Sequence, residues 1–382
     1  MAAPTASTIS ASRVLVADDQ PNVIDALLFL LKAAGIGADR ASSPEEVVAM
    51  IGGGKYDLLL MDMNYARDTT SGEEGLELLH QVKAVDPALS VVVMTAWSTI
   101  EIAVASLQHG ASDFIQKPWD NEAALRIIET QIAACKSRRR DVSLRRAEAE
   151  DAAQMHRTLL GASSAGFGRF TIAAGTRSHR EVGGDYFDFF ETREDQVAIA
   201  IADVMGKGVG AALLMANLQA HFRTQAQHEK SPAEICDSLN TTLLRTSGGR
   251  LATMIAAQLN VPAGILTFCT AGHPEAIYVT ANGTLESLTS DGAVMGSFAT
   301  ARYQNATREM RAGDRIVMVT DGFLEPENAV GEELGESRLA QWVHDLRAFG
   351  AVEIYDRLNA RLIEFAGDRV ADDATLVVIA AD

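Results

Sequence analysis

Aspartates that directly follow apolar runs recur in both halves of this chain, and they constrain its fold more than any other feature. In the first half, Asp18 and Asp19 follow ValLeuValAla, and Asp62 follows LeuLeuLeuMet. In the second half, Asp203 and Asp321 end comparable runs. Carboxylates gathered at strand ends repel one another unless cations hold them, so each half predicts a divalent-metal site.

Length, charge and cysteine content limit the classes of function. The 382 residues suffice for two or three domains with separate cores. A formal net charge of −18 disfavours nucleic-acid binding, because phosphate backbones attract positive surfaces. The three cysteines form no CxxC pair and fit reduced, intracellular thiols. Without a secretory start or an apolar run near the ~18 residues of a membrane helix, we expect a cytoplasmic protein without membrane contact.

In the first half, short apolar runs alternate with helical periodicity. This alternation predicts an α/β, doubly wound parallel sheet of the flavodoxin-like kind, with its site at the carboxyl ends of the strands. We assign 1–12 to a flexible tail and 13–125 to this domain. The expected strands are 13–17, 36–40, 57–61, 90–94 and 113–116, and the expected helices are 21–34, 44–52, 73–85 and 99–109.

A strand-free stretch separates the halves, and we assign 126–160 to a helical linker. Its basic residues, between 136 and 146, fit a solvated helix face. A loose heptad-like seam also allows a coiled coil that would join two copies as a homodimer, although two arginines interrupt it. The seam consists of Ile128, Ile132, Cys135 and Val142.

In the remainder, assigned to a domain at 161–382, strands follow one another while helices are grouped apart. This pattern predicts an α+β fold. The expected strands are 169–174, 185–190, 196–202, 251–260, 264–270, 275–280 and 315–320. The expected helices are 209–227, 231–246, 337–347 and 351–366.

The first predicted site has a chemical role for each polar residue at the strand ends. Asp18, Asp19 and Asp62 can hold Mg²⁺, with the carbonyl of Asn64 as a further oxygen ligand. Asp62 is also a carboxylate nucleophile that can accept a phosphoryl group. Any one of these aspartates alone could instead be a helix cap.

Four short motifs make this half resemble the receiver domain of two-component response regulators. They are ValAlaAspAspGlnPro at 16–21, LeuMetAspMetAsn at 60–64, MetThrAla at 94–96 and GlnLysPro at 116–118. The resemblance implies that a sensor histidine kinase or phosphotransfer protein phosphorylates Asp62. It also implies that Thr95 and Phe114 form the switch, with Lys117 at the phosphate, and that the Lys117–Pro118 bond is cis.

The second predicted site gathers aspartates that lie far apart in the sequence. Asp185, Asp203, Asp321 and Asp372 are all associated with strands. Four such carboxylates could bind two Mn²⁺ or Mg²⁺ ions, which activate a water for attack on a phosphoester. No His or Cys nucleophile is then needed.

A glycine-rich turn follows Asp203 directly. Gly206, Lys207 and Gly208 lie between it and an expected helix, so the backbone can approach a metal or a phosphate closely. Lys207 could contact the substrate phosphate, and a solvated loop lysine is an equally good interpretation.

The second half resembles the SpoIIE-type branch of the metal-dependent, type 2C-like protein phosphatases. The resembling segments are 154–160, 181–188, 203–208, 271–274, 320–322 and 372–375. The resemblance implies a β-sandwich flanked by helices that hydrolyses phosphoserine and phosphothreonine. The implied metal ligands are Asp185, Asp203 with the carbonyl of Val204, Asp321, Asp372 and, with less support, Asp373. We expect Asp188 and His273 to be structural.

Two other functions compete with that of a phosphatase. A phosphatase-like domain that has lost activity could bind a partner as a sigma-factor adaptor does, but such a domain should have lost some of its aspartates. GlyGlyAspTyrPhe at 183–187 is a poor match to the signature of cyclic-dinucleotide synthases. By analogy with the family, the substrate would be a phosphorylated anti-sigma-factor antagonist.

Overall fold

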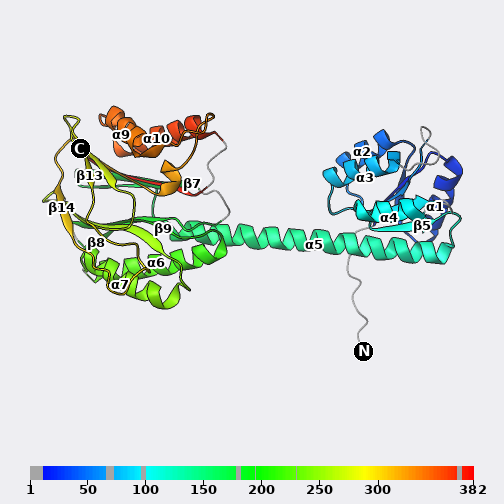
Figure 1. Ribbon diagram of the computed structural model, residues 1–382, viewed down its shortest axis with the longest axis horizontal. Helices are drawn as coiled ribbons and strands as arrows, with labels where there is room; N and C mark the ends of the chain where they lie inside the picture. Colours follow the sequence, from blue (N-terminus) through cyan, green and yellow to red (C-terminus); the bar gives the residue numbers. More distant parts are fainter. Residues whose placement is uncertain are drawn as a thin grey trace. The chain divides into compact units, whose positions relative to one another are not determined.

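The computed structural model describes residues 12–65, 73–95, 100–177, 182–193, 195–228, 230–367 and 372–382. The tail expected at 1–12 lies outside this range except for its last residue. The chain forms two compact units, 1–147 and 148–382, which are described separately below (Figure 1). No helix in the described part is long and apolar enough to cross a membrane.

The first unit is built on a five-stranded parallel sheet. Its strands are β1 (Arg13–Ala17), β2 (Gly37–Ala41), β3 (Leu58–Asp62), β4 (Ser90–Thr95) and β5 (Asp113–Gln116). Their order is β2-β1-β3-β4-β5, which confirms the predicted doubly wound fold. After β1, the chain adds β2 on one side and then β3 on the other, so the strand order reverses between β1 and β3. Doubly wound folds bind their ligands at this point.

Helices cover both faces of this sheet. They are α1 (Pro21–Ala33), α2 (Pro44–Gly53), α3 (Glu73–Val85), α4 (Ile100–Gln108) and the first part of α5 (Asn121–Leu159). The side chains of β1, β3 and β4 are almost all buried, as expected for strands covered on both faces. Apolar clusters fill the space on each side of the sheet.

The structure corrects two expectations for the linker. Ile128, Ile132 and Cys135 are buried beside the first unit's own sheet, so only Val142 of the proposed seam is exposed. Part of the basic stretch is also not a solvated face. Arg139 forms an ion pair with Asp86, at 2.5 Å between Nη2 and Oδ2. The apolar periodicity of 128–135 therefore reflects packing within one chain and gives no support to a coiled coil. The homodimer remains a prediction.

The second unit contains two antiparallel sheets. Its strands are β6 (Ser164–Phe167), β7 (Phe170–Arg177), β8 (Tyr186–Arg193), β9 (Gln196–Val204), β10 (Ala252–Asn260), β11 (Ile265–Ala271), β12 (Ala276–Val279), β13 (Leu285–Leu288), β14 (Ala306–Glu309), β15 (Arg315–Val319) and β16 (Ala374–Ala381). One sheet has the order β14-β11-β10-β9-β8 and the other β13-β12-β15-β16-β7-β6. The predicted sandwich is confirmed.

Helices flank both sheets of the sandwich (Figure 1). They are α6 (Val209–Gln227), α7 (Pro232–Thr246), α8 (Asp321–Leu324), α9 (Gly335–Leu346) and α10 (Ala351–Ala366). An apolar core lies between the sheets, a second joins α6 and α7 to one sheet, and a third joins α9 and α10 to the other. Sequence reasoning missed β6, β13 and β14, which are four-residue strands, and also the buried strand β16.

An ion pair between a buried carboxylate and a half-buried guanidinium fixes α6 against β8. The Asp188 side chain is fully buried and accepts hydrogen bonds from Arg223, at 2.6 Å from Nε and 3.0 Å from Nη2. The Tyr186 hydroxyl also donates to Asp188, at 2.7 Å. These contacts confirm the structural role expected for Asp188.

We expect Asp188→Ala to lower the free energy of unfolding by about 2 kcal/mol, because it leaves the buried hydroxyl of Tyr186 without its hydrogen-bond partner and removes the charged partner of Arg223. Glu353→Ala is the matched control, since it breaks an exposed pair with Arg357 and should cost at most about 1 kcal/mol. Urea titration of the full chain, followed by circular dichroism, measures both. Equal effects would show that the ion pair of Asp188 has no special role.

Candidate functional site

Three aspartates of the first unit meet at the carboxyl edge of its sheet. Asp18 and Asp19 follow β1 and Asp62 ends the neighbouring strand β3, so parallel pairing brings them together. One carboxylate oxygen from each lies within 4.8 Å of the others. Asp18 and Asp62 are buried while Asp19 is exposed. The structure thus places together the ligands predicted for Mg²⁺, whose preferred partners are oxygens.

Lys117, which follows β5, joins two of these carboxylates. Its Nζ lies 2.6 Å from Oδ2 of Asp18 and 3.1 Å from Oδ1 of Asp62. Burial raises the pKa of Asp62, and the ammonium of Lys117 opposes that rise. Because one ammonium faces three carboxylates, negative charge is left over for a divalent cation.

The remaining predicted residues of this site lie around the same edge. Thr95 is buried at the end of β4, and its carbonyl accepts the amide of Lys117 at 2.7 Å. Asn64 is half-buried just after β3, and Phe114 is exposed on β5. The Lys117–Pro118 peptide bond is cis, as predicted.

Tyr65 is a neighbour of this site that sequence reasoning missed. Its side chain is buried and its hydroxyl has no hydrogen-bond partner within the described residues. Burial raises the pKa of Tyr65, and the charge of Asp62 adds to the rise. The signal available in the sequence was its position three residues after Asp62.

In the second unit, two aspartates lie side by side on adjacent antiparallel strands. Tyr186 of β8 pairs with Ala202 of β9, so Asp185 and Asp203 are the next facing residues. Asp185 is buried and accepts hydrogen bonds from the hydroxyls of Thr320, at 2.8 Å, and Thr375, at 2.5 Å. The sheet register therefore brings together residues 18 positions apart.

These two carboxyl groups are hard to ionise together. Burial and the charge of Asp321 raise the pKa of Asp203 to about 7, while a hydrogen bond with Asp185 opposes the rise. Burial raises the pKa of Asp185 well above its ordinary value, and the charge of Asp203 adds to this. A cation between them would remove that penalty, as at other paired-carboxylate sites.

Glycines let the backbone close around this pair. A Cβ on Gly183 would lie 1.6 Å from Oδ2 of Asp373, and one on Gly184 would lie 2.5 Å from the carbonyl oxygen of Val204. A Cβ on Gly322 would lie 1.9 Å from the carbonyl oxygen of Asp373. No side chain fits at these three positions without moving a proposed metal ligand. The residues present therefore suit a tight metal centre.

The other predicted ligands surround the pair. Asp321 is the first residue of α8, and Asp372 and Asp373 directly precede β16. Lys207 lies beside Gly206 in the turn after β9, and its Nζ is 2.8 Å from Oδ2 of Asp372. Within the described residues, only the first unit's aspartates have oxygens all within 4.8 Å of one another. A site for two ions about 3.5–4 Å apart spreads its ligands more widely.

Sequence reasoning missed two further residues near this site. Burial and then the charges of Asp321 and Asp372 raise the pKa of Glu325, which places it at the rim of the site. The guanidinium of Arg250 lies over the glycine-rich turn, 2.8 Å from where a Cβ on Gly210 would be. No local pattern marks either residue.

His273 is buried and has the structural role expected for it. Its Nδ1 lies 2.8 Å from the hydroxyl of Thr253, a residue that pairs with Asp203 in the sheet. Burial lowers the pKa of this ring to about 3, so it is neutral near pH 7. It supports the strands behind the site.

Two family models match the chain. The model described as "Response regulator receiver domain" matches residues 14–129. The model described as "Stage II sporulation protein E (SpoIIE)" matches residues 193–382. The first range contains the carboxylate cluster of the first unit. The second contains every predicted ligand of the second unit except Asp185.

The named relatives are of two kinds, phosphatases and transcriptional regulators. The phosphoserine phosphatase RsbU of Bacillus subtilis is 28% identical over 236 residues, which are 61% of this chain and 70% of RsbU. The DNA-binding transcriptional regulator NtrC of Salmonella typhimurium is 34% identical over 120 residues, which are 31% of this chain but only 24% of NtrC. The SiaA-PP2C domain of Pseudomonas aeruginosa has a TM-score of 0.56 at 20% identity, covering 63% of this chain and 99% of that domain. That last likeness shows the fold alone.

We expect Gly183→Ala to weaken Mn²⁺ binding at the second site by at least about 10-fold, because its Cβ would displace the carboxylate of Asp373. Gly166→Ala is the matched control, since a Cβ there meets no atom within 4 Å. Isothermal titration calorimetry compares the two. If both variants bind Mn²⁺ as the wild type does, the glycine contacts do not shape the site.

Proposed function

The chain belongs to the response regulator receiver family over residues 14–129 and to the SpoIIE family over residues 193–382, and from this we propose how it works. It is a receiver joined to a protein serine/threonine phosphatase. We propose that phosphorylation of Asp62 controls this phosphatase. The phosphoryl donor would be a sensor histidine kinase or a phosphotransfer protein, and the chain would act in the cytoplasm.

The pair formed by the buried Asp185 and the half-buried Asp203 carries the proposal for the catalytic site. Two carboxyl groups with raised pKa values, closely surrounded by backbone, are what a site for divalent cations requires. Asp321 beside the pair is exposed to solvent, and Asp372 is half-buried. Mn²⁺ or Mg²⁺ bound here would activate water and neutralise the charge of the phosphate.

The protein's own residues would hold this arrangement in place. The hydroxyls of Thr320 and Thr375 donate to Asp185 and fix the direction of its carboxylate. The carbonyl of Val204 lies against Gly184 and would offer a further oxygen ligand. Lys207 holds the Asp372 carboxylate and would also bring positive charge to the entering phosphate.

In the receiver, Asp62 would attack the phosphorus of a phosphohistidine and release the imidazole. Lys117 is placed to pair with the new phosphoryl oxygens, since it already contacts Asp62 and Asp18. The hydroxyl of Thr95, on the neighbouring strand, would donate to the phosphoryl group. Asp18 and Asp19 would hold Mg²⁺ beside it.

The proposed substrate is a phosphorylated anti-sigma-factor antagonist, released by dephosphorylation to engage its partner. Support comes from the two phosphoserine phosphatases among the relatives, RsbU and RsbP of Bacillus subtilis. A response regulator whose output is a phosphatase would act by this route without contacting DNA. The net charge of −18 agrees with that.

The test is Mn²⁺-dependent hydrolysis of a phosphoserine protein by the full chain, with and without acetyl phosphate as phosphoryl donor. Loss of a residue that only orients a metal ligand costs roughly 10–100-fold. Because Asp203 is proposed to bind the metal directly, we expect Asp203→Asn to lower the rate by more than that. Asp62→Asn should keep the basal rate and abolish the response to acetyl phosphate.

Each variant answers a separate question. Activity that survives Asp203→Asn would contradict the catalytic assignment. An inactive wild type that still binds phosphoprotein would support a binding module instead. A response to acetyl phosphate that persists in Asp62→Asn would remove the regulatory link.

A further inference from the structure

His156 is a buried polar residue that the function described above does not use. It lies near the end of α5, and its Nε2 is 3.2 Å from the carbonyl oxygen of Gly183. Because a carbonyl oxygen only accepts hydrogen bonds, Nε2 carries the proton. The bond connects positions 27 residues apart, so it fixes tertiary structure.

The accepting carbonyl belongs to the segment that delivers a metal ligand. Gly183 lies against the carboxylate of Asp373, and Gly184 lies against the carbonyl of Val204. Asp185 follows directly. A shift of the Gly183 carbonyl would therefore move Asp185 relative to the Asp373 carboxylate and the Val204 carbonyl, which are the neighbouring oxygens proposed to bind metal.

The same helix end holds this segment on its other side. The amide of Gly161, just after α5, donates to the carbonyl of Phe187 at 3.0 Å. Gly161 also packs on Asp188, since a Cβ there would lie 2.9 Å from Oδ1 of that residue. Contacts at 183 and at 187–188 thus bracket Asp185.

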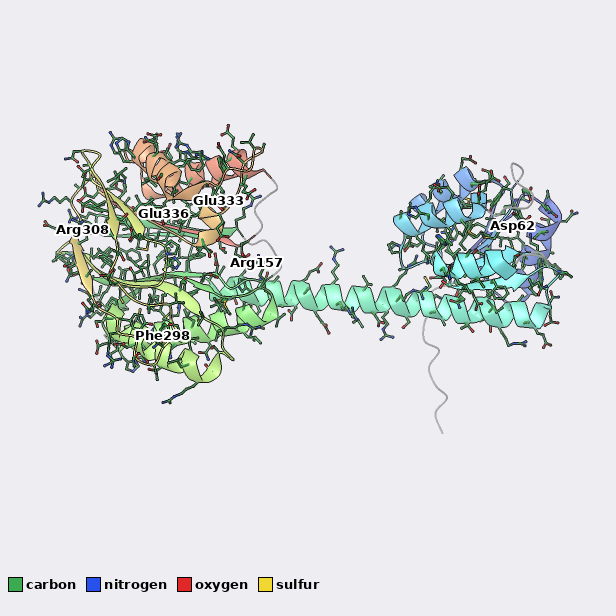
Figure 2. The ribbon with its side chains drawn as sticks, viewed as in Figure 1. Asp62, Arg157, Phe298, Arg308, Glu333 and Glu336 are labelled. Carbon is green, nitrogen blue, oxygen red and sulfur yellow. The ribbon has the colours of Figure 1, made fainter. Side chains whose placement is uncertain are left out.

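Packing alone does not hold the His156 ring. A cavity of about 680 Å³ lies beside it, lined among others by Arg157 and Leu160 of α5 and its adjoining turn and by Tyr355 of α10. Figure 2 marks Arg157, near the end of α5. Leu159 and Leu160 anchor the helix end in the apolar core, and the bond to Gly183 fixes the His156 ring on the side that borders the cavity.

We propose that His156 is a positioning residue for the metal site: its bond to the Gly183 carbonyl holds Asp185 at the distance from Asp203 that bound cations require. This rests on the proposed function, because it concerns the same pair of aspartates. It acts through the backbone and touches neither metal nor substrate. Outer-shell partners of this kind set the orientation of metal ligands.

The experiment measures Mn²⁺ binding to the full chain by calorimetry, with Asp62→Asn in every sample to weaken the first site. We expect His156→Leu to weaken binding at the second site by at least about 10-fold. His156→Gln, whose amide can donate to the same carbonyl, should restore binding to within about threefold. His228→Leu is the matched control, because that exposed ring also contacts a backbone carbonyl, at 2.7 Å.

The outcomes separate positioning from folding. Melting temperatures from circular dichroism show whether each variant folds. If His156→Leu does not fold, His156→Asn replaces it, since its amide is too short to reach Gly183. Equal weakening by the Leu and Gln variants, or none in either, would overturn the proposal. A wild type that binds Mn²⁺ but lacks phosphatase activity would contradict the proposed function, while the binding comparison still decides the role of His156.

Discussion

The repulsion between the carboxyl groups of Asp185, which is buried, and Asp203, which is half-buried, is the constraint on which the second unit depends. Folding brings them together because β8 and β9 pair in one register, and burial then raises the pKa of both. Hydroxyl donors on Thr320 and Thr375 offset part of that cost. Bound cations, as proposed above, would offset the remaining cost.

The first unit handles the same problem differently. Two of its three carboxylates, those of Asp18 and Asp62, contact the ammonium of Lys117 (Figure 2 marks Asp62). The cluster is therefore partly neutralised before any metal binds, and Asp19 stays open to solvent. Such a site suits a reversible phosphoryl group, because the added charge finds a cation already in place.

Much of this was predictable because strand-end positions are local information. The strands next to Asp18, Asp62 and Asp203 were predicted from their apolar runs to within about two residues at each end. What could not be read was any feature created by tertiary contact. The bond from His156 to Gly183 and the place of Arg250 over the turn depend on residues far apart in sequence. The heptad-like pattern of the linker was misread for the same reason, since Ile128 and Ile132 pack in the core of their own unit.

The most direct measurement is a crystal structure of the full chain grown with Mn²⁺, with the ions located by anomalous scattering. We expect two manganese peaks between Asp185, Asp203, Asp321 and Asp372. A peak beside Asp18, Asp19 and Asp62 serves as the internal reference. If that reference peak is present while none appears between Asp185 and Asp203, these aspartates do not form the proposed metal site.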